Sequence, residues 1–131
     1  MTTHHVAELR LCVTTDDRAG AVAFFRDVLG MPELATWTHE DSAVTLLEAG
    51  RATIELTDPD YADHIDAVEV GRRVAGPIRV ALAVDDVVGA TDDAVANGAG
   101  LIAPPTVTPW ASRNSRLAGP AGLQLTLFAD A

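Results

Sequence analysis

One sequence pattern occurs twice in this chain, at a constant spacing of 69 residues. Segments 9–17 and 78–86 each begin with five residues that suit a β-strand, with an arginine in second place, and each ends in an Asp-Asp pair. A stretch of helical periodicity follows each segment. Because the spacing is about half of the 131 residues, the repeat indicates a duplicated structural unit. We therefore expect a single domain, residues 1–131, made of two similar halves.

The first half is predicted to fold as a βαβββ unit. Apolar and polar residues alternate from 8 to 15, which indicates a half-buried strand. Asp17 can then cap a helix that ends at Gly30. Three further strands are expected near residues 33–38, 42–48 and 51–57.

The second half repeats this order of elements. A strand at 77–84 is followed by Asp86, which opens a helix to about Asn97. Three strands are then expected near residues 100–107, 111–117 and 122–128. Residues 58–76 are polar and contain turn signals, so they are interpreted as the linker between the halves.

Together, the two halves predict an α+β fold. Two tandem βαβββ modules, at 8–57 and 77–128, would form a curved mixed sheet around a cup, with the helices on its outer face. The inner face would carry six mostly polar side chains, namely Glu8, Arg10, Glu55, Arg79, Gln124 and Phe128. Such a face needs no ligand, so a merely solvated surface stays an alternative.

Composition narrows the chemistry that this cup can perform. All nine basic residues are arginines, and the lack of lysine excludes Schiff-base chemistry and a P-loop lysine. A formal net charge of -10 argues against nucleic acid as a partner. The sequence has no apolar run of about 18 residues and no signal-peptide pattern, which argues against a membrane and favours a cytoplasmic location. The single cysteine, Cys12, is expected to be a small buried thiol.

Two short segments carry patterns beyond the repeat itself. In residues 17–30 an aromatic pair precedes Leu-Gly at the end of the predicted helix, and residues 119–122 read Gly-Pro-Ala-Gly. With the duplicated βαβββ unit, these segments resemble the vicinal oxygen chelate superfamily over residues 8–128. That superfamily includes glyoxalase I, bleomycin-resistance proteins and extradiol dioxygenases. The resemblance implies the fold but no single activity, because members are lyases, isomerases, dioxygenases or binding proteins.

The metal enzymes of that superfamily imply a particular set of ligands. A His or Gln from the first strand of each module and a carboxylate from the last strand of each would hold a divalent ion. The equivalent positions here are Arg10, Arg79, Glu55 and either Thr126 or, with a strict 69-residue offset, Gln124. Arginine stays protonated and offers no lone pair, so we expect no metal and no other cofactor.

The charges at these positions leave two arrangements open. An arginine buried without a partner costs about 3–5 kcal/mol, so Glu55 is expected to pair with Arg10 or Arg79. A closed Arg-Glu-Arg bridge would only fill the vacated metal site. A free guanidinium would instead bind a ligand carboxylate or phosphate, or stack on a flat ring.

Two tryptophans lie in similar parts of the two modules, 73 residues apart. Trp37 and Trp110 can form walls of the cup, where stacking on a planar ligand contributes about 0.5–1.5 kcal/mol beyond area burial. Either of them can instead belong to the core or to a dimer interface. The segment 108–114 resembles a loop that borders the ligand in binding members of the family, with Arg113 and Asn114 as polar rim groups.

These features predict a metal-independent small-molecule-binding protein of the bleomycin-resistance kind, which sequesters an aromatic or heterocyclic compound. The residues expected to bind it are Arg10, Trp37, Glu55, Arg79, Trp110, Arg113, Asn114, Gln124 and Phe128. The resemblance also implies a homodimer. One alternative is a lyase, isomerase or dioxygenase that uses Glu55 as a base beside Arg79, or a rearranged metal site built on His64 with Asp63 or Asp66. Another is a purely structural or regulatory partner protein whose cup is filled.

Overall fold

The computed structural model describes residues 3–28, 30–119 and 122–131. Leu29, Pro120 and Ala121, which belong to the family-like segments, lie outside the described residues. In chain order the elements are β1 (Val6–Thr14), α1 (Arg18–Val22), its π-helical continuation η1 (Ala23–Val28), β2 (Glu33–His39), β3 (Ser42–Ala49), β4 (Ala52–Thr57), α2 (Pro59–Glu69), β5 (Ile78–Val84), α3 (Val87–Ala96), β6 (Gly100–Val107), β7 (Ser112–Ala118) and β8 (Gln124–Asp130). Each strand expected from the sequence is present, with bounds within two residues of those predicted.

The strands form one mixed sheet in the order β2-β3-β4-β1-β5-β8-β7-β6. β1 is parallel to β4, and β5 is parallel to β8. The two modules join through the antiparallel pair of β1 and β5, so they pair within one chain. The expected α+β fold with a mixed sheet is therefore confirmed, and the sequence had left the pairing of the modules open.

The register of β1 and β5 makes the repeat nearly two-fold symmetric. Leu11 lies opposite Val80, which is its own equivalent 69 positions later. The same symmetry relates Arg10 to Arg79, and Arg79 lies opposite Cys12. Because side chains alternate between the two faces of a strand, both arginines project from the same face of the sheet.

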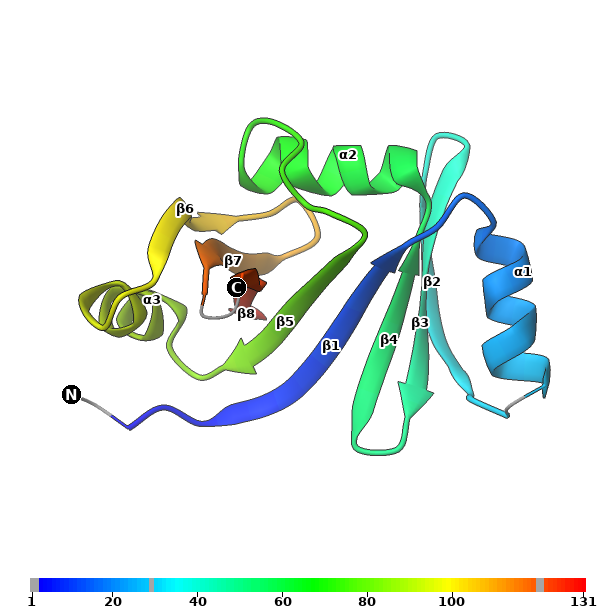
Figure 1. Ribbon diagram of the computed structural model, residues 1–131, viewed down its shortest axis with the longest axis horizontal. Coiled ribbons are helices and arrows are strands. Elements are labelled where there is room, and N and C mark those ends of the chain that lie inside the picture. The colour runs from blue at the N-terminus through cyan, green and yellow to red at the C-terminus, as the bar shows by residue number, and fades with distance from the viewer. Residues whose placement is uncertain (1–2, 29, 120–121) are drawn as a thin grey trace.

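Two helices cover the outer face of the sheet at its opposite ends, as expected (Figure 1). Each begins at an aspartate cap: the Asp17 carboxylate accepts a hydrogen bond from the Gly20 amide at 2.9 Å, and Asp86 does the same for Gly89 at 3.0 Å. α1 packs on β3 and β4, and α3 packs on β5, β7 and β8, which gives each module a small apolar core. No helix in the described residues is long and apolar enough to cross a membrane.

The segment interpreted as a linker, 58–76, contains a helix of 11 residues, α2, that the sequence analysis did not predict. Tyr61 and Ile65 give α2 an apolar side that packs on β3. The helix was missed because its other buried residues include the acids Asp66 and Glu69, which interrupt the apolar periodicity. α2 contacts β2, β3 and β7, so it spans both modules (Figure 1). α2 therefore covers the inner face of the sheet, which is not the uncovered face that the solvated alternative assumed.

Candidate ligand-binding cavity

A cavity of about 210 Å³ lies between the inner face of the sheet and α2. Seven of the nine residues expected to bind a ligand line it, namely Arg10, Trp37, Glu55, Arg79, Trp110, Asn114 and Phe128. The lining residues that come from α2 were not predicted, and these are Tyr61, Ile65 and Glu69. The side chains of the cup do not fill it, so the expectation of a filled cup is wrong. Ligand binding by these residues stays a prediction.

The strand register identifies the residues that replace the family's metal ligands. Cys12 of β1 lies opposite Glu55 of β4, and its repeat equivalent Ala81 lies opposite Thr126 of β8. Thr126, and not Gln124, is therefore the counterpart of Glu55. The four positions all line the cavity, and they are Arg10, Glu55, Arg79 and Thr126.

This set of side chains does not fit a divalent metal ion. Two of the four positions are arginines without a lone pair, and Thr126 offers only a hydroxyl. Within the described ranges, no three His, Cys, Asp or Glu side chains converge as metal ligands. His64 stacks on His39 with ring centroids 3.6 Å apart, and the acids considered as its partners, Asp63 and Asp66, each pair with an arginine. The rearranged metal site therefore has no ligand cluster in the described residues.

The expected pairing of Glu55 with an arginine is wrong. The Arg10 Nε lies 2.8 Å from the Glu8 carboxylate, and the Arg10 guanidinium lies 4.9 Å from the centroid of the Phe128 ring. Glu55 instead accepts a hydrogen bond from the Cys12 thiol, with 3.2 Å between sulfur and oxygen. The reason is local: Glu8 precedes Arg10 by two residues on the same face of the same strand, so it reaches the guanidinium directly.

Cys12 is a buried thiol, as predicted. Burial raises the pKa of the Cys12 thiol, and the negative charge of Glu55 raises it further, so the thiol is a neutral hydrogen-bond donor. It engages one carboxylate oxygen of Glu55, and the other oxygen has no hydrogen-bond partner among the described residues. Because β1 lies between β4 and β5, Cys12 also separates Glu55 from Arg79.

Arg79 has a different environment from Arg10. It is only 9% exposed, and its Nη1 donates a hydrogen bond to the Thr126 hydroxyl at 2.7 Å. No carboxylate of the described residues lies within ion-pair distance of it. Burial acts to lower the pKa of the Arg79 guanidinium, and the negative charges of Glu55, Glu69 and Asp66 act to raise it. Arg79 is therefore a charged, buried group with most of its donors unused.

Aromatic side chains form the mouth of the cavity. Trp37 and Trp110 line it and are 41% and 38% exposed, so neither is a core residue. His64 of α2 lies beside Trp110, with ring centroids 6.0 Å apart. Tyr61 and Phe128 also line the cavity, which thus holds four of the six Phe, Trp and Tyr residues in the sequence. A flat ring would find stacking partners here.

Two of the predicted residues do not line the cavity. Arg113 is exposed because it alternates along β7 with the inward-facing Asn114. Gln124 accepts a hydrogen bond from Arg116 at 2.8 Å and donates one to the Val74 carbonyl at 3.1 Å. Its amide therefore ties the segment after α2 to the sheet and is not turned into the cavity.

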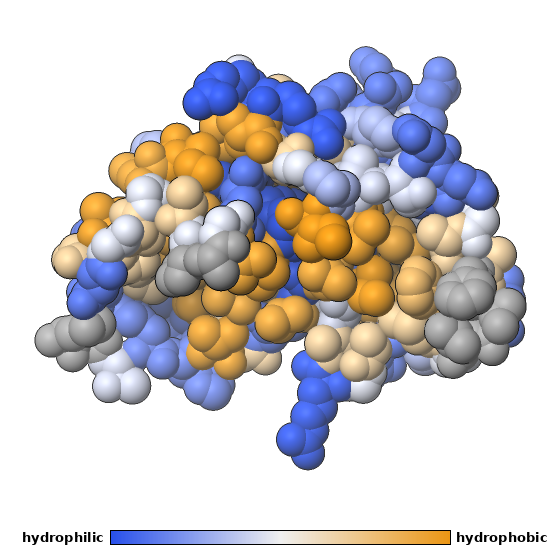
Figure 2. All heavy atoms as spheres, viewed as in Figure 1, coloured by the Kyte–Doolittle hydropathy of each residue, from blue (hydrophilic) through white to orange (hydrophobic). Residues whose placement is uncertain are grey.

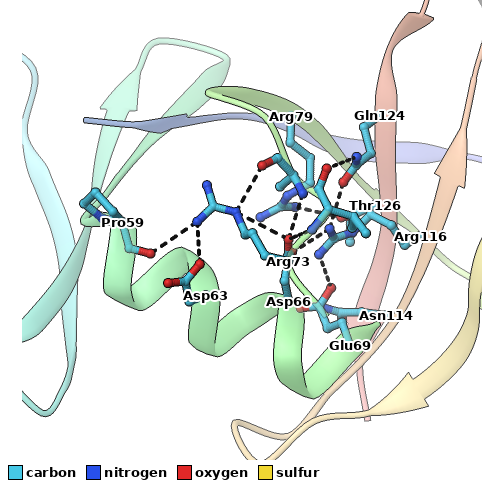
Figure 3. Close-up of polar contacts among 12 residues, drawn as sticks. Pro59, Asp63, Asp66, Glu69, Arg73, Arg79, Asn114, Arg116, Gln124 and Thr126 are labelled. Carbon is cyan, nitrogen blue, oxygen red and sulfur yellow. Dashed lines mark hydrogen bonds and ion pairs between the residues drawn. The ribbon is translucent and has the colours of Figure 1, made fainter. Parts of the chain in front are cut away.

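A fully buried arginine, Arg116, anchors α2 over the sheet (Figure 3). Its guanidinium donates to Asp66 at 2.7 Å and to Glu69 at 3.1 Å, and the Asn114 amide donates to the second Glu69 oxygen at 2.9 Å. The strand side of this contact could be predicted from the sequence, because Arg116 and Asn114 share one face of a predicted strand. No sequence pattern indicated that segment 58–76 crosses that strand.

Comparison with known proteins gives a family match and a set of similar folds. The family model of the Glyoxalase/Bleomycin resistance protein/Dioxygenase superfamily matches residues 2–127, and no curated protein matches significantly.

A hypothetical protein from Bacillus halodurans C-125 is 14% identical over 97% of this chain and 94% of its own, with a TM-score of 0.70. Methylmalonyl-CoA epimerase from Mycobacterium tuberculosis is 20% identical over 100% and 93% of the two chains, with a TM-score of 0.70. A Streptomyces coelicolor epimerase variant in complex with 2-nitronate-propionyl-CoA is 20% identical over 97% and 99%, with a TM-score of 0.69. At these identities the structural similarity shows the fold alone.

The buried anchor of α2 can be tested with two arginines of β7. Arg116→Met leaves the carboxylates of Asp66 and Glu69 buried without their cation, so we expect the free energy of unfolding to fall by about 3–5 kcal/mol. Arg113→Met removes an exposed arginine from the same strand and should change it by less than about 0.5 kcal/mol. Urea unfolding followed by circular dichroism measures both. Equal effects of the two substitutions would contradict the role of Arg116 as the anchor.

Proposed function

Because the chain belongs to the Glyoxalase/Bleomycin resistance protein/Dioxygenase superfamily, we propose that it is a metal-independent small-molecule-binding protein that sequesters an aromatic or heterocyclic compound. One observation carries this proposal. The positions that hold the ion in the family's metal enzymes carry a side-chain set that does not fit a metal, and these side chains line a cavity with an aromatic mouth. A cavity of this kind captures a ligand without performing chemistry on it.

The cavity offers apolar contact together with a few directional polar groups. Trp37 or Trp110 would stack on a flat ring, and Val44 and Ile65 supply apolar surface beside them. Each aromatic stack contributes about 0.5–1.5 kcal/mol beyond area burial. Arg79 would orient a polar substituent of the ligand. Drug sequestration of the bleomycin-resistance kind is one use of such a pocket.

A metal-free enzyme is the second candidate, and Glu55 is the residue that favours it. One Glu55 oxygen has no partner among the described residues, and the side chain lines the same cavity as the charged Arg79. A carboxylate base beside a fixed cation suits proton abstraction next to a carbonyl group. One of the similar solved structures is methylmalonyl-CoA epimerase in complex with methylmalonyl-CoA, which suggests a compound for the test.

We also propose that the protein forms a homodimer. Leu9 and Ile78 lie on the outer face of β1 and β5, where they are 41% and 54% exposed. Figure 2 shows hydrophobic side chains gathered over the middle of the molecule, in the region where Figure 1 draws these two strands. A second copy of the chain would remove this apolar surface from water.

Native mass spectrometry with metal analysis of the freshly purified protein tests the proposed function. We expect a chain that carries a small organic mass and less than stoichiometric divalent metal, because the four key side chains do not fit an ion. Trp110→Ala should retain less of that organic mass, since it removes a wall of the mouth. Val107→Ala, at an exposed residue that does not line the cavity, is the matched control and should retain the wild-type amount. A stoichiometric divalent ion in the wild-type protein would contradict metal-independent binding.

Hydrogen–deuterium exchange into methylmalonyl-CoA separates binding from catalysis. Incubation in D₂O with the wild-type protein should leave the deuterium content of the compound at the protein-free level, as read by mass spectrometry. Exchange that depends on the protein and disappears in Glu55→Gln would favour the enzyme, because only a working base exchanges the proton.

Light scattering after size-exclusion chromatography tests the dimer. The wild-type protein should have twice the mass of the chain, and Leu9→Glu should reduce it to a monomer because it places a charge in the apolar contact. Val107→Glu adds the same charge on β6 and should stay dimeric. A monomeric wild-type protein would contradict the proposal.

A further inference from the structure

The two arginines of the repeat are equivalent in sequence but not in structure. Arg10 is held by Glu8, two residues before it. The place equivalent to Glu8 in the second module, 69 residues later, is occupied by Pro77. No carboxylate therefore precedes Arg79 on its own strand, and among the described residues its only hydrogen bond runs to Thr126.

Arg79 has unused capacity to bind an anion. A guanidinium carries five N–H donors, and the Arg79 side chain uses one of them, at 2.7 Å, in the described structure. The residue is nine-tenths buried and lines the cavity. A ligand carboxylate bound by two parallel hydrogen bonds would give this guanidinium the ion-pair partner that the described residues do not supply.

Glu55 places a complementary acceptor near this cation. Glu55, Cys12 and Arg79 lie in one row across β4, β1 and β5. Neighbouring strands are about 4.8 Å apart, so the backbones of the outer two residues are separated by roughly 10 Å. The Cys12 thiol holds one Glu55 oxygen at 3.2 Å and leaves the other available to a donor. One small ligand could therefore contact both the Arg79 guanidinium and the second Glu55 oxygen.

The remaining charges favour a monoanionic ligand. Glu55, Glu69 and Asp130 all line the cavity, the charge of Arg10 there is paired with Glu8, and the chain has a formal net charge of -10. These charges repel a dianionic phosphate more strongly than a carboxylate. A planar carboxylate also matches the fork of a guanidinium. The aromatic mouth at Trp37 and Trp110 would then contact the rest of the ligand.

We propose that the cavity selects small aromatic carboxylic acids that carry a hydroxyl or amino group next to the carboxylate. Arg79 binds the carboxylate, Glu55 accepts a hydrogen bond from the hydroxyl or amino group, and the ring lies against the aromatic mouth. This inference rests on the proposed function, because it names the ligand class of the same site.

Intrinsic fluorescence provides the test, since Trp37 and Trp110 are the only tryptophans in the sequence and both line the cavity. The wild-type protein is titrated with three probes of nearly the same shape. Mandelate carries both the carboxylate and the hydroxyl, phenylacetate lacks the hydroxyl, and mandelamide lacks the charge. We expect mandelate to bind most tightly, and each of the other two to bind roughly 10-fold or more weakly.

Three substitutions test which residues produce the preference for mandelate. Arg79→Met should remove the preference for mandelate over mandelamide, and Glu55→Leu should remove the preference for mandelate over phenylacetate. Pro77→Glu supplies the carboxylate that Arg10 has and Arg79 lacks, so it should weaken mandelate binding with Arg79 still in place. Arg51→Met, at a hairpin tip outside the cavity, should bind all three probes as the wild type does. If Arg79→Met fails to fold, as judged by circular dichroism, Pro77→Glu carries the same test.

Equal affinity of the wild type for mandelate and mandelamide would overturn the inference, and so would wild-type mandelate binding by Arg79→Met. A failure of all three probes to bind would overturn it as well. An organic molecule retained in native mass spectrometry would then leave the proposed function standing, whereas no retained molecule and no probe binding would contradict both.

Discussion

The antiparallel pairing of β1 with β5 determines where the charged side chains of the cavity lie. Leu11 faces its own repeat equivalent, Val80, so the first-strand positions of both modules meet at the centre of one sheet. The parallel partners β4 and β8 then bring Glu55 and Thr126 beside them. Because this centre is built from four hydrogen-bonded strands, its side chains are held by the sheet and do not depend on a loop.

A single difference between the two halves breaks the symmetry of that centre. Glu8 neutralises Arg10, whereas Pro77 leaves Arg79 without a carboxylate neighbour on its strand. The Cys12 thiol binds one oxygen of Glu55, and β1 lies between that carboxylate and Arg79. A duplicated module has thus become a site in which Arg10 is paired with a carboxylate and Arg79, among the described residues, is not. Because of this asymmetry, a ligand carboxylate is expected to bind at Arg79 and not at Arg10.

The helix between the modules converts an exposed sheet face into a cavity. Its C-terminal half is fixed by the buried ion pairs of Arg116 with Asp66 and Glu69. The middle of the helix adds an aromatic contact, the stack of His64 on His39. Buried ion pairs contribute little net stability because desolvation offsets their attraction, but breaking one of them is costly. They therefore set the position of α2 more than they stabilise the fold.

The sequence by itself determined the elements of both modules, because each strand and each outer helix has its own apolar periodicity. Each outer helix also begins at an aspartate cap, Asp17 or Asp86. The alternation along the strands also identified Arg10, Glu55 and Arg79 as residues of one inner face. Only the tertiary structure decided which charges pair. The register between strands separates Glu55 from Arg79, and the partner of Asp66 lies 50 residues away in the chain. A local sequence pattern indicates whether a side chain is buried, but it does not identify a polar partner far away in the chain. The position of α2 over the sheet and the lack of a carboxylate partner for Arg79 among the described residues therefore could not be predicted from the sequence.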